Sequence, residues 1–213
     1  MREVQFNEDD PAFWERCYEE GEPGWDAGGP VPPLVRVARD RELLAGVEQV
    51  AFVGSGPGHD ALDWARAGYH VMGFDFAAPA VRAANERARA AGLGERCRFQ
   101  RADLFELGEP YAGVFDAVVE YTCFCAIHPE RRGEYREVVE RILRPGGLLV
   151  GLWFPASDPG ENGPPYRVRR EDVSRLFLRG RGAFELVHEE QPPDSIPRRL
   201  GRERLMILRK PLR

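Results

Sequence analysis

The chain has 213 residues, of which 43% are hydrophobic and 31% are charged, and its formal net charge is −5. This composition predicts one globular domain, and the negative charge argues against binding to nucleic acid or anionic lipid. The longest apolar run, residues 148–154, is far shorter than the roughly 20 residues of a membrane span, and residues 1–30 lack the features of a signal peptide. We expect a cytoplasmic monomer that binds neither membrane nor nucleic acid.

Helical and extended patterns alternate along the chain. The sequence predicts a helix at residues 11–20, a loop rich in glycine and proline at 21–33, and a helix at 34–46. Strands and helices then follow in turn. The predicted strands are residues 49–53, 69–74, 98–101, 114–120, 148–154, 184–189 and 205–208, and the predicted helices among them are 59–67, 77–91, 131–143 and 171–178.

This order of elements is typical of an α/β fold. We predict a doubly wound, Rossmann-like sheet of seven mostly parallel strands, in which the hairpin of the last two strands supplies a reversed edge strand. A sheet of this kind binds its ligand at the carboxyl ends of its strands. The whole chain is expected to form a single domain, in which residues 1–33, hereafter the N-terminal segment, precede the sheet.

A glycine-rich turn follows the first predicted strand, with Gly54, Gly56 and Gly58 in a G-x-G-x-G pattern. Glycines here let the backbone turn sharply and let a ligand approach the amides at the start of the next helix. The alternative is an ordinary glycine-rich turn. Asp75 ends the second strand 21 residues after Gly54, where its carboxylate could accept both hydroxyls of a ribose. It could also serve as the N-cap of the next helix.

The spacing of the turn favours S-adenosylmethionine (SAM) over a nicotinamide dinucleotide. The dinucleotide pattern requires glycine or alanine at position 59, where this chain has His59. Asp103, after the third strand, is placed to accept the adenine amino group, and Leu104 to pack on the adenine ring. We expect no metal, because Cys123 and Cys125 are too close together and too isolated for a zinc site and are typical of core thiols.

Beyond the glycine turn, the chain carries longer and more specific motifs. They are FWERCY with PGWD at residues 13–18 and 23–26, YTCFCAIHPERR at 121–132, PPYRV at 164–168 and EEQPPDSIP at 189–197. With these motifs the chain resembles the thiopurine S-methyltransferase family, and most closely its thiol/halide methyltransferase branch. Tyr18, Ser55 and Glu120 stand where tryptophan, cysteine and aspartate are frequent in that branch, which leaves the acceptor open.

The resemblance implies that Trp14, Tyr18 and Trp25 cover the bound cofactor as a lid. Aromatic faces suit this role because their quadrupole attracts a sulfonium cation. The alternative is that Trp14 and Trp25 anchor the first helix to the sheet. Glu120, at the end of the fourth strand, would face the cationic methionine end of the cofactor, with Tyr121 beside it in the cofactor site. Alternatively, Glu120 is a solvated carboxylate at the sheet edge.

The predicted activity is transfer of a methyl group from SAM to a small soft nucleophile: a thiol, bisulfide, a halide or thiocyanate. An ionised acceptor needs positioning and a dry pocket rather than a base, and the four histidines are scattered, so we expect no general base. Tyr166, in the Pro-Pro-Tyr motif, is the predicted catalytic residue on the acceptor side. The alternatives are a larger thiopurine-like acceptor, a nicotinamide-dependent oxidoreductase, and a non-catalytic SAM-binding module.

Overall fold

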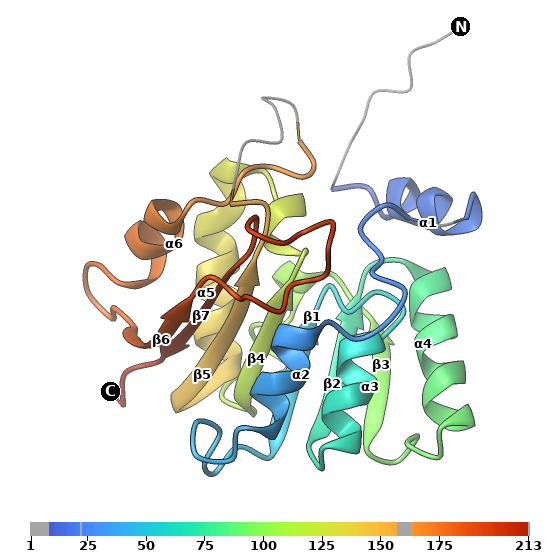
Figure 1. The fold of residues 1–213 in the computed structure, drawn as a ribbon, viewed down its shortest axis with the longest axis horizontal. Coiled ribbons are helices and arrows are strands. Elements are labelled where there is room, and N and C mark those ends of the chain that lie inside the picture. The colour runs from blue at the N-terminus through green and yellow to red at the C-terminus, as the bar shows by residue number, and fades with distance from the viewer. Residues whose placement is uncertain (1–8, 22, 157–162, 213) are drawn as a thin grey trace, which may run out of the picture.

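The computed structural model describes residues 9–21, 23–156 and 163–212. Seven strands form one sheet at its centre (Figure 1). They are β1 (Gln49–Val53), β2 (His70–Asp75), β3 (Cys97–Arg101), β4 (Phe115–Tyr121), β5 (Leu143–Trp153), β6 (Glu185–Glu190) and β7 (Arg204–Arg209). Their order across the sheet is β3-β2-β1-β4-β5-β7-β6. The strand order reverses between β1 and β4, which is where a doubly wound sheet binds its ligand.

One strand runs against the others. β1 to β5 pair in parallel, whereas β7 pairs antiparallel with both β5 and β6. The reversed strand predicted for this end of the sheet is therefore β7, and β6 completes the edge. The predicted doubly wound α/β fold is confirmed.

Helices cover both faces of the sheet. They are α1 (Pro11–Glu19), α2 (Pro32–Arg39), α3 (His59–Arg66), α4 (Ala78–Ala90), α5 (Arg132–Ile142) and α6 (Arg170–Phe177), with short 3₁₀ helices η1 (Leu104–Glu106), η2 (Phe124–Ala126) and η3 (Pro129–Arg131). One apolar core packs α2, α3 and α4 on one face, and a second packs α5 and α6 on the other. α1 has no buried residue and lies above α4 (Figure 1). Within the described ranges, no helix is long and apolar enough to cross a membrane.

Two predicted boundaries are wrong for identifiable reasons. The second helix was expected to run to residue 46, but α2 ends at Arg39, because Asp40 leaves the helical conformation and its carboxylate accepts the N–H of Leu43 in the following turn. Residues 144–147 were expected to separate a helix from a strand, but they belong to β5. They remain extended because Gly146 and the next glycine exchange backbone hydrogen bonds with Lys210.

Candidate functional site

A cavity of about 650 Å³ lies at the carboxyl ends of β1, β2 and β4. Its wall is formed by the glycine turn, these strand ends, the N-terminal segment and residues 191–203, hereafter the β6–β7 loop. A cavity of this size suits a small organic ligand. The predicted site residues in its wall are Trp14, Tyr18, Trp25, Gly54, Gly56, Asp75, Asp103, Leu104 and Tyr121.

The glycine turn connects β1 to α3 through a backbone that other residues would strain. Gly54, Gly56 and Gly58 all have positive φ, at 59°, 51° and 81°. A Cβ atom at Gly54 would lie 2.6 Å from the Cβ of Cys123, and one at Gly58 would lie 2.6 Å from the ring of Phe99. Gly58 therefore lies outside the cavity wall and lets α3 pack closely against the sheet, while the first two glycines leave room beside the cavity.

Asp75 connects the end of β2 to the glycine turn. Its Oδ2 accepts the N–H of Gly56 at 2.7 Å, and its Oδ1 accepts the N–H of Ala77 at 2.9 Å. The N-cap of α4 is Ala77, so Asp75 is not the cap itself. Burial raises the pKa of the Asp75 carboxyl. A carboxylate accepts about four hydrogen bonds, so both oxygens keep capacity for ribose hydroxyls.

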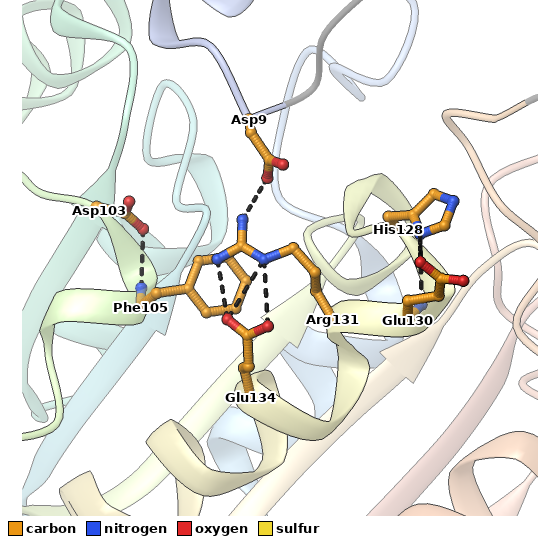
Figure 2. Close-up of polar contacts among 7 residues, drawn as sticks. All are labelled: Asp9, Asp103, Phe105, His128, Glu130, Arg131 and Glu134. Carbon is orange, nitrogen blue, oxygen red and sulfur yellow. Dashed lines mark hydrogen bonds and ion pairs between the residues drawn. The ribbon is translucent and has the colours of Figure 1, made fainter.

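Asp103 lies at the next strand end along this edge. Its Oδ1 accepts the N–H of Phe105 at 2.8 Å, which starts η1 and places Phe105 in the cavity wall (Figure 2). The guanidinium carbon of Arg131 lies 3.7 Å from the centroid of the Phe105 ring (Figure 2). Arg131 also pairs with Glu134 and with Asp9. This edge of the cavity therefore connects the N-terminal segment to the start of α5.

The three predicted lid aromatics form one cluster over the cavity. The ring of Trp25 packs edge-to-face on Trp14 and Tyr18, at centroid distances of 5.2 and 5.7 Å, and its Nε1 donates to the Tyr18 hydroxyl at 3.2 Å. Burial raises the pKa of Tyr18, which keeps its hydroxyl protonated. None of the three belongs to either apolar core, and α1 contributes no buried residue. This packing argues against a role in anchoring α1 to the sheet.

Polar contacts hold the cluster in place. Asp26 Oδ1 lies 3.3 Å from Nε2 of His59 at the start of α3, and this contact lowers the pKa of Asp26. Two arginines of the β6–β7 loop donate to backbone carbonyls of the N-terminal segment, Arg198 to Asp26 and Arg199 to Trp25. The two ends of the chain therefore meet over the cavity.

Glu120 lies beneath the cavity rather than in its wall. Its side chain is 1% exposed, and its Oε2 accepts the N–H of Phe124 at 3.1 Å. Burial raises the pKa of Glu120 to about 8. The alternative of a solvated carboxylate at the sheet edge is therefore wrong. The side chain supports the turn that follows β4.

That turn brings strained backbone and two thiols to the cavity wall. Thr122 has a φ of 63°, which a β-branched residue rarely adopts. Cys123 and Cys125 also contribute to the wall, and burial raises the pKa of both thiols, so they stay protonated and poorly nucleophilic. In the part of the chain that the structure describes, no three His, Cys, Asp or Glu side chains gather as a metal site.

Sequence reasoning missed the basic wall of the cavity. Arg198, Arg199 and Arg202 all contribute to it from the β6–β7 loop. Arg199 is 3% exposed, and its guanidinium lies 4.8 and 4.7 Å from the ring centroids of Tyr121 and Phe154. The only signal was the run RRLGRER at residues 198–204. In a chain whose basic residues are nearly all arginine, such a run does not differ from a solvated surface.

The predicted acceptor residue lies beside the cavity. Pro164 and Pro165 contribute to the wall, but Tyr166 does not. Its backbone N–H donates to the carbonyl of Cys125 at 2.7 Å, and its ring packs edge-to-face on His128 at 5.4 Å. Its catalytic role stays a prediction.

The residues of the cavity match the chemistry of SAM. Asp75 could hold the ribose hydroxyls, Asp103 the adenine amino group, and the aromatic cluster the sulfonium. Two features of the structure support the fit. A Cβ at Gly54 would collide with the opposite wall, and the buried Oγ of Ser55 has no hydrogen-bond partner among the described residues.

Comparisons with known proteins identify the family. The family "Thiopurine S-methyltransferase (TPMT)" matches residues 9–205. Thiocyanate methyltransferase 1 from Arabidopsis thaliana is 32% identical over 192 residues, which cover 90% of this chain and 82% of that protein. Probable thiol methyltransferase 2 from the same plant is 31% identical over 200 residues, covering 93% and 85%.

Solved structures share the fold. The 1,6-didemethyltoxoflavin-N1-methyltransferase of Burkholderia thailandensis, solved with 1,6-didemethyltoxoflavin and S-adenosylhomocysteine bound, superposes with a TM-score of 0.76 at 23% identity, covering 94% of this chain and 87% of that one. Magnesium protoporphyrin IX methyltransferase of Synechocystis PCC 6803, also with bound S-adenosylhomocysteine, gives 0.65 at 20% identity, covering 84% and 80%. With the family matched over nearly its whole length, the chain belongs to the thiopurine S-methyltransferase family and is a SAM-dependent methyltransferase.

Proposed function

We propose that this enzyme moves the methyl group of SAM to a small, soft nucleophile: a thiol, bisulfide, a halide or thiocyanate. The observation that carries the proposal is the buried guanidinium of Arg199 in the cavity wall. Its Nη1 has no hydrogen-bond partner in the described part of the chain, and it lies between two aromatic rings. A guanidinium is weakly hydrated, so this dry wall favours weakly hydrated anions over strongly hydrated oxyanions.

The relatives support the same class of acceptor, since one is a thiocyanate methyltransferase and another a probable thiol methyltransferase. SAM supplies a methyl group that its positive sulfonium makes reactive. The chain would then bind and orient the two reactants and exclude water from between them. Asp75 would fix the nucleoside, the aromatic cluster would cover the sulfonium, and Arg199 would hold an anionic acceptor in line with the methyl carbon.

A larger, thiopurine-like acceptor is the second candidate. The cavity volume of about 650 Å³ supports it, because pockets of this size also hold drug-sized ring compounds. Membership of a methyltransferase family replaces the nicotinamide-dependent and non-catalytic alternatives.

Replacement of Arg199 tests the proposal. A hydrogen bond to a charged group contributes about 1.5–3 kcal/mol, so Arg199→Gln should raise the KM for iodide and thiocyanate by about 10- to 150-fold. Binding of S-adenosylhomocysteine should change much less. Arg82→Gln, on the exposed face of α4, is the matched control. Unchanged KM values for both anions in a folded Arg199→Gln enzyme would remove Arg199 from the acceptor site.

Tyr166 gives a second, independent variant. If its hydroxyl reaches the acceptor, Tyr166→Phe lowers turnover of the anion more than it weakens SAM binding. The proximity of Pro164 and Pro165 to the cavity supports this role. Equal turnover by Tyr166→Phe and the wild type would assign Tyr166 to packing against His128.

We also propose that the enzyme acts as a cytoplasmic monomer, and that it forms one domain with the N-terminal segment as its lid. One chain supplies the whole wall of the cavity described above. All four cysteines are free thiols, as is usual in a reducing compartment. Light scattering at working concentration tests the oligomeric state.

A further inference from the structure

A buried carboxylate lies behind the basic wall, and the mechanism above does not use it. Glu203, at the end of the β6–β7 loop, is 1% exposed. Its Oε1 accepts a hydrogen bond from the hydroxyl of Tyr121 at 2.6 Å and lies 3.9 Å from Nη1 of Arg199. Its Oε2 has no hydrogen-bond partner within the described ranges. Tyr121 therefore stands between the cavity and an acceptor of protons.

Tyr121 cannot act as a base by itself. Burial, together with the nearby Glu203 carboxylate, raises the pKa of Tyr121, so its hydroxyl remains protonated. It can accept a proton only while it gives its own proton away. The short hydrogen bond to Glu203 provides the group to which that proton would go.

We propose that Tyr121 and Glu203 together form the general base for protonated thiol acceptors, an inference that rests on the acceptor class proposed above. The thiol sulfur forms its bond to the methyl carbon as the bond from that carbon to the sulfonium sulfur breaks. The thiol proton moves to the oxygen of Tyr121, whose own proton moves to Oε1 of Glu203. The products are a neutral thioether, neutral S-adenosylhomocysteine and a protonated Glu203, which later releases its proton to water. The lost sulfonium charge and the lost carboxylate charge cancel.

The charged groups that face Tyr121 come from two elements. Arg199 and Glu203 belong to the β6–β7 loop, and Asp60 belongs to α3. Burial raises the pKa of Asp60 to about 7, but Asp60 accepts the N–H of Val31 at 2.8 Å and so holds the N-terminal segment. Ionisation of Asp60 would affect all acceptors alike. Iodide, which carries no proton, therefore serves as the internal reference.

This base changes the pH dependence expected from the sequence. Without a base, turnover of a thiol rises with its thiolate fraction up to the thiol pKa. With the Tyr121–Glu203 base, turnover of methanethiol relative to iodide stays nearly level below the thiol pKa. Removal of the base should restore the rise of about tenfold per pH unit.

The test compares kcat/KM for methanethiol and for iodide between about pH 6 and about pH 9. The variants are Glu203→Gln, Tyr121→Phe, both together, and the control Glu137→Gln on the exposed face of α5. Each single variant should lower the methanethiol value at pH 7 by about 100-fold or more, because general bases contribute about 10²- to 10⁴-fold. The iodide value should change far less, and the double variant should fall no further than the worse single variant.

The outcomes separate this inference from the proposed function. Equal losses for iodide and methanethiol, with the thiol profile unchanged in shape, would show that Glu203 only positions Arg199 and would overturn the base. Wild-type methylation of iodide but not of methanethiol would overturn it as well. Methylation of neither acceptor would instead overturn the proposed function. Calorimetry with S-adenosylhomocysteine verifies that each variant is folded, and Tyr121→Phe decides the matter if Glu203→Gln is not.

Discussion

The acidic residues around the cavity differ in role because their partners differ. Asp75 bonds the backbone of the glycine turn, Asp103 starts η1, Glu120 supports the turn after β4, and Glu203 accepts the hydroxyl of Tyr121. Only Asp75 and Asp103 contribute to the cavity wall. The two others act on the site through neighbouring residues.

Asp75 carries the first prediction at this scale. A charge-assisted hydrogen bond contributes about 1.5–3 kcal/mol, so Asp75→Ala should weaken binding of S-adenosylhomocysteine by about 10- to 150-fold. Asp75→Asn, which keeps an acceptor for the N–H of Gly56, should lose less. Calorimetry gives both dissociation constants. An unchanged constant in a folded Asp75→Ala protein would exclude Asp75 from the cofactor site.

Glu120 carries a prediction about stability. Its pKa is about 8 in the folded protein and near 4.5 when exposed, so between these values the folded state binds more protons than the unfolded state. The contribution of Glu120 is therefore fully present below about pH 4.5 and is lost as the pH rises to about 8, by up to about 1.4 kcal/mol per pH unit. Glu120→Gln should remove this part of the slope.

Urea unfolding at several pH values measures this effect as the difference between wild type and variant. Glu137→Gln, an exposed replacement on α5, should leave the slope unchanged. A wild type and a Glu120→Gln variant with parallel pH dependence would mean that Glu120 is ionised in the folded protein at neutral pH.

At the scale of elements, local patterns predicted the sheet and its order of strands and helices. Residues 144–147 contain the proline and glycines that usually end an element, but long-range pairing with β7 keeps them in β5. Asp40 ends α2 through a local hydrogen bond that competes with the helix. Both differences arise from interactions that hydrophobic periodicity does not contain.

The N-terminal segment carries the prediction at this scale. Its aromatic cluster packs on the cavity and outside both cores, so α1 and residues 23–30 should be ordered by ligand binding. Their amide hydrogens should exchange faster in the apo protein than with S-adenosylhomocysteine. Amides of α2, whose residues Leu34 and Val37 are core, serve as the control. Equal exchange with and without the ligand would assign the cluster to the permanent fold.

At the scale of the whole molecule, the site joins segments that are far apart in the chain. The glycine turn and Asp75 could be predicted because their pattern is local and tied to the first two strands. Arg199 and Glu203 could not, because they reach the cavity only when β7 inserts between β5 and β6 and brings the β6–β7 loop to Trp25 and Tyr121. The acceptor side therefore depends on the complete sheet.

A product screen tests the proposed acceptor class most directly. The purified enzyme is incubated with SAM and, separately, iodide, bisulfide and methanethiol, and the headspace is analysed by gas chromatography. Methyl iodide, methanethiol and dimethyl sulfide should appear in turn, with iodide turnover free of any acceptor ionisation across the pH range. No volatile product from iodide or from bisulfide, together with methylation of a larger catechol, carboxylate or thiopurine, would contradict a small soft nucleophile as the acceptor.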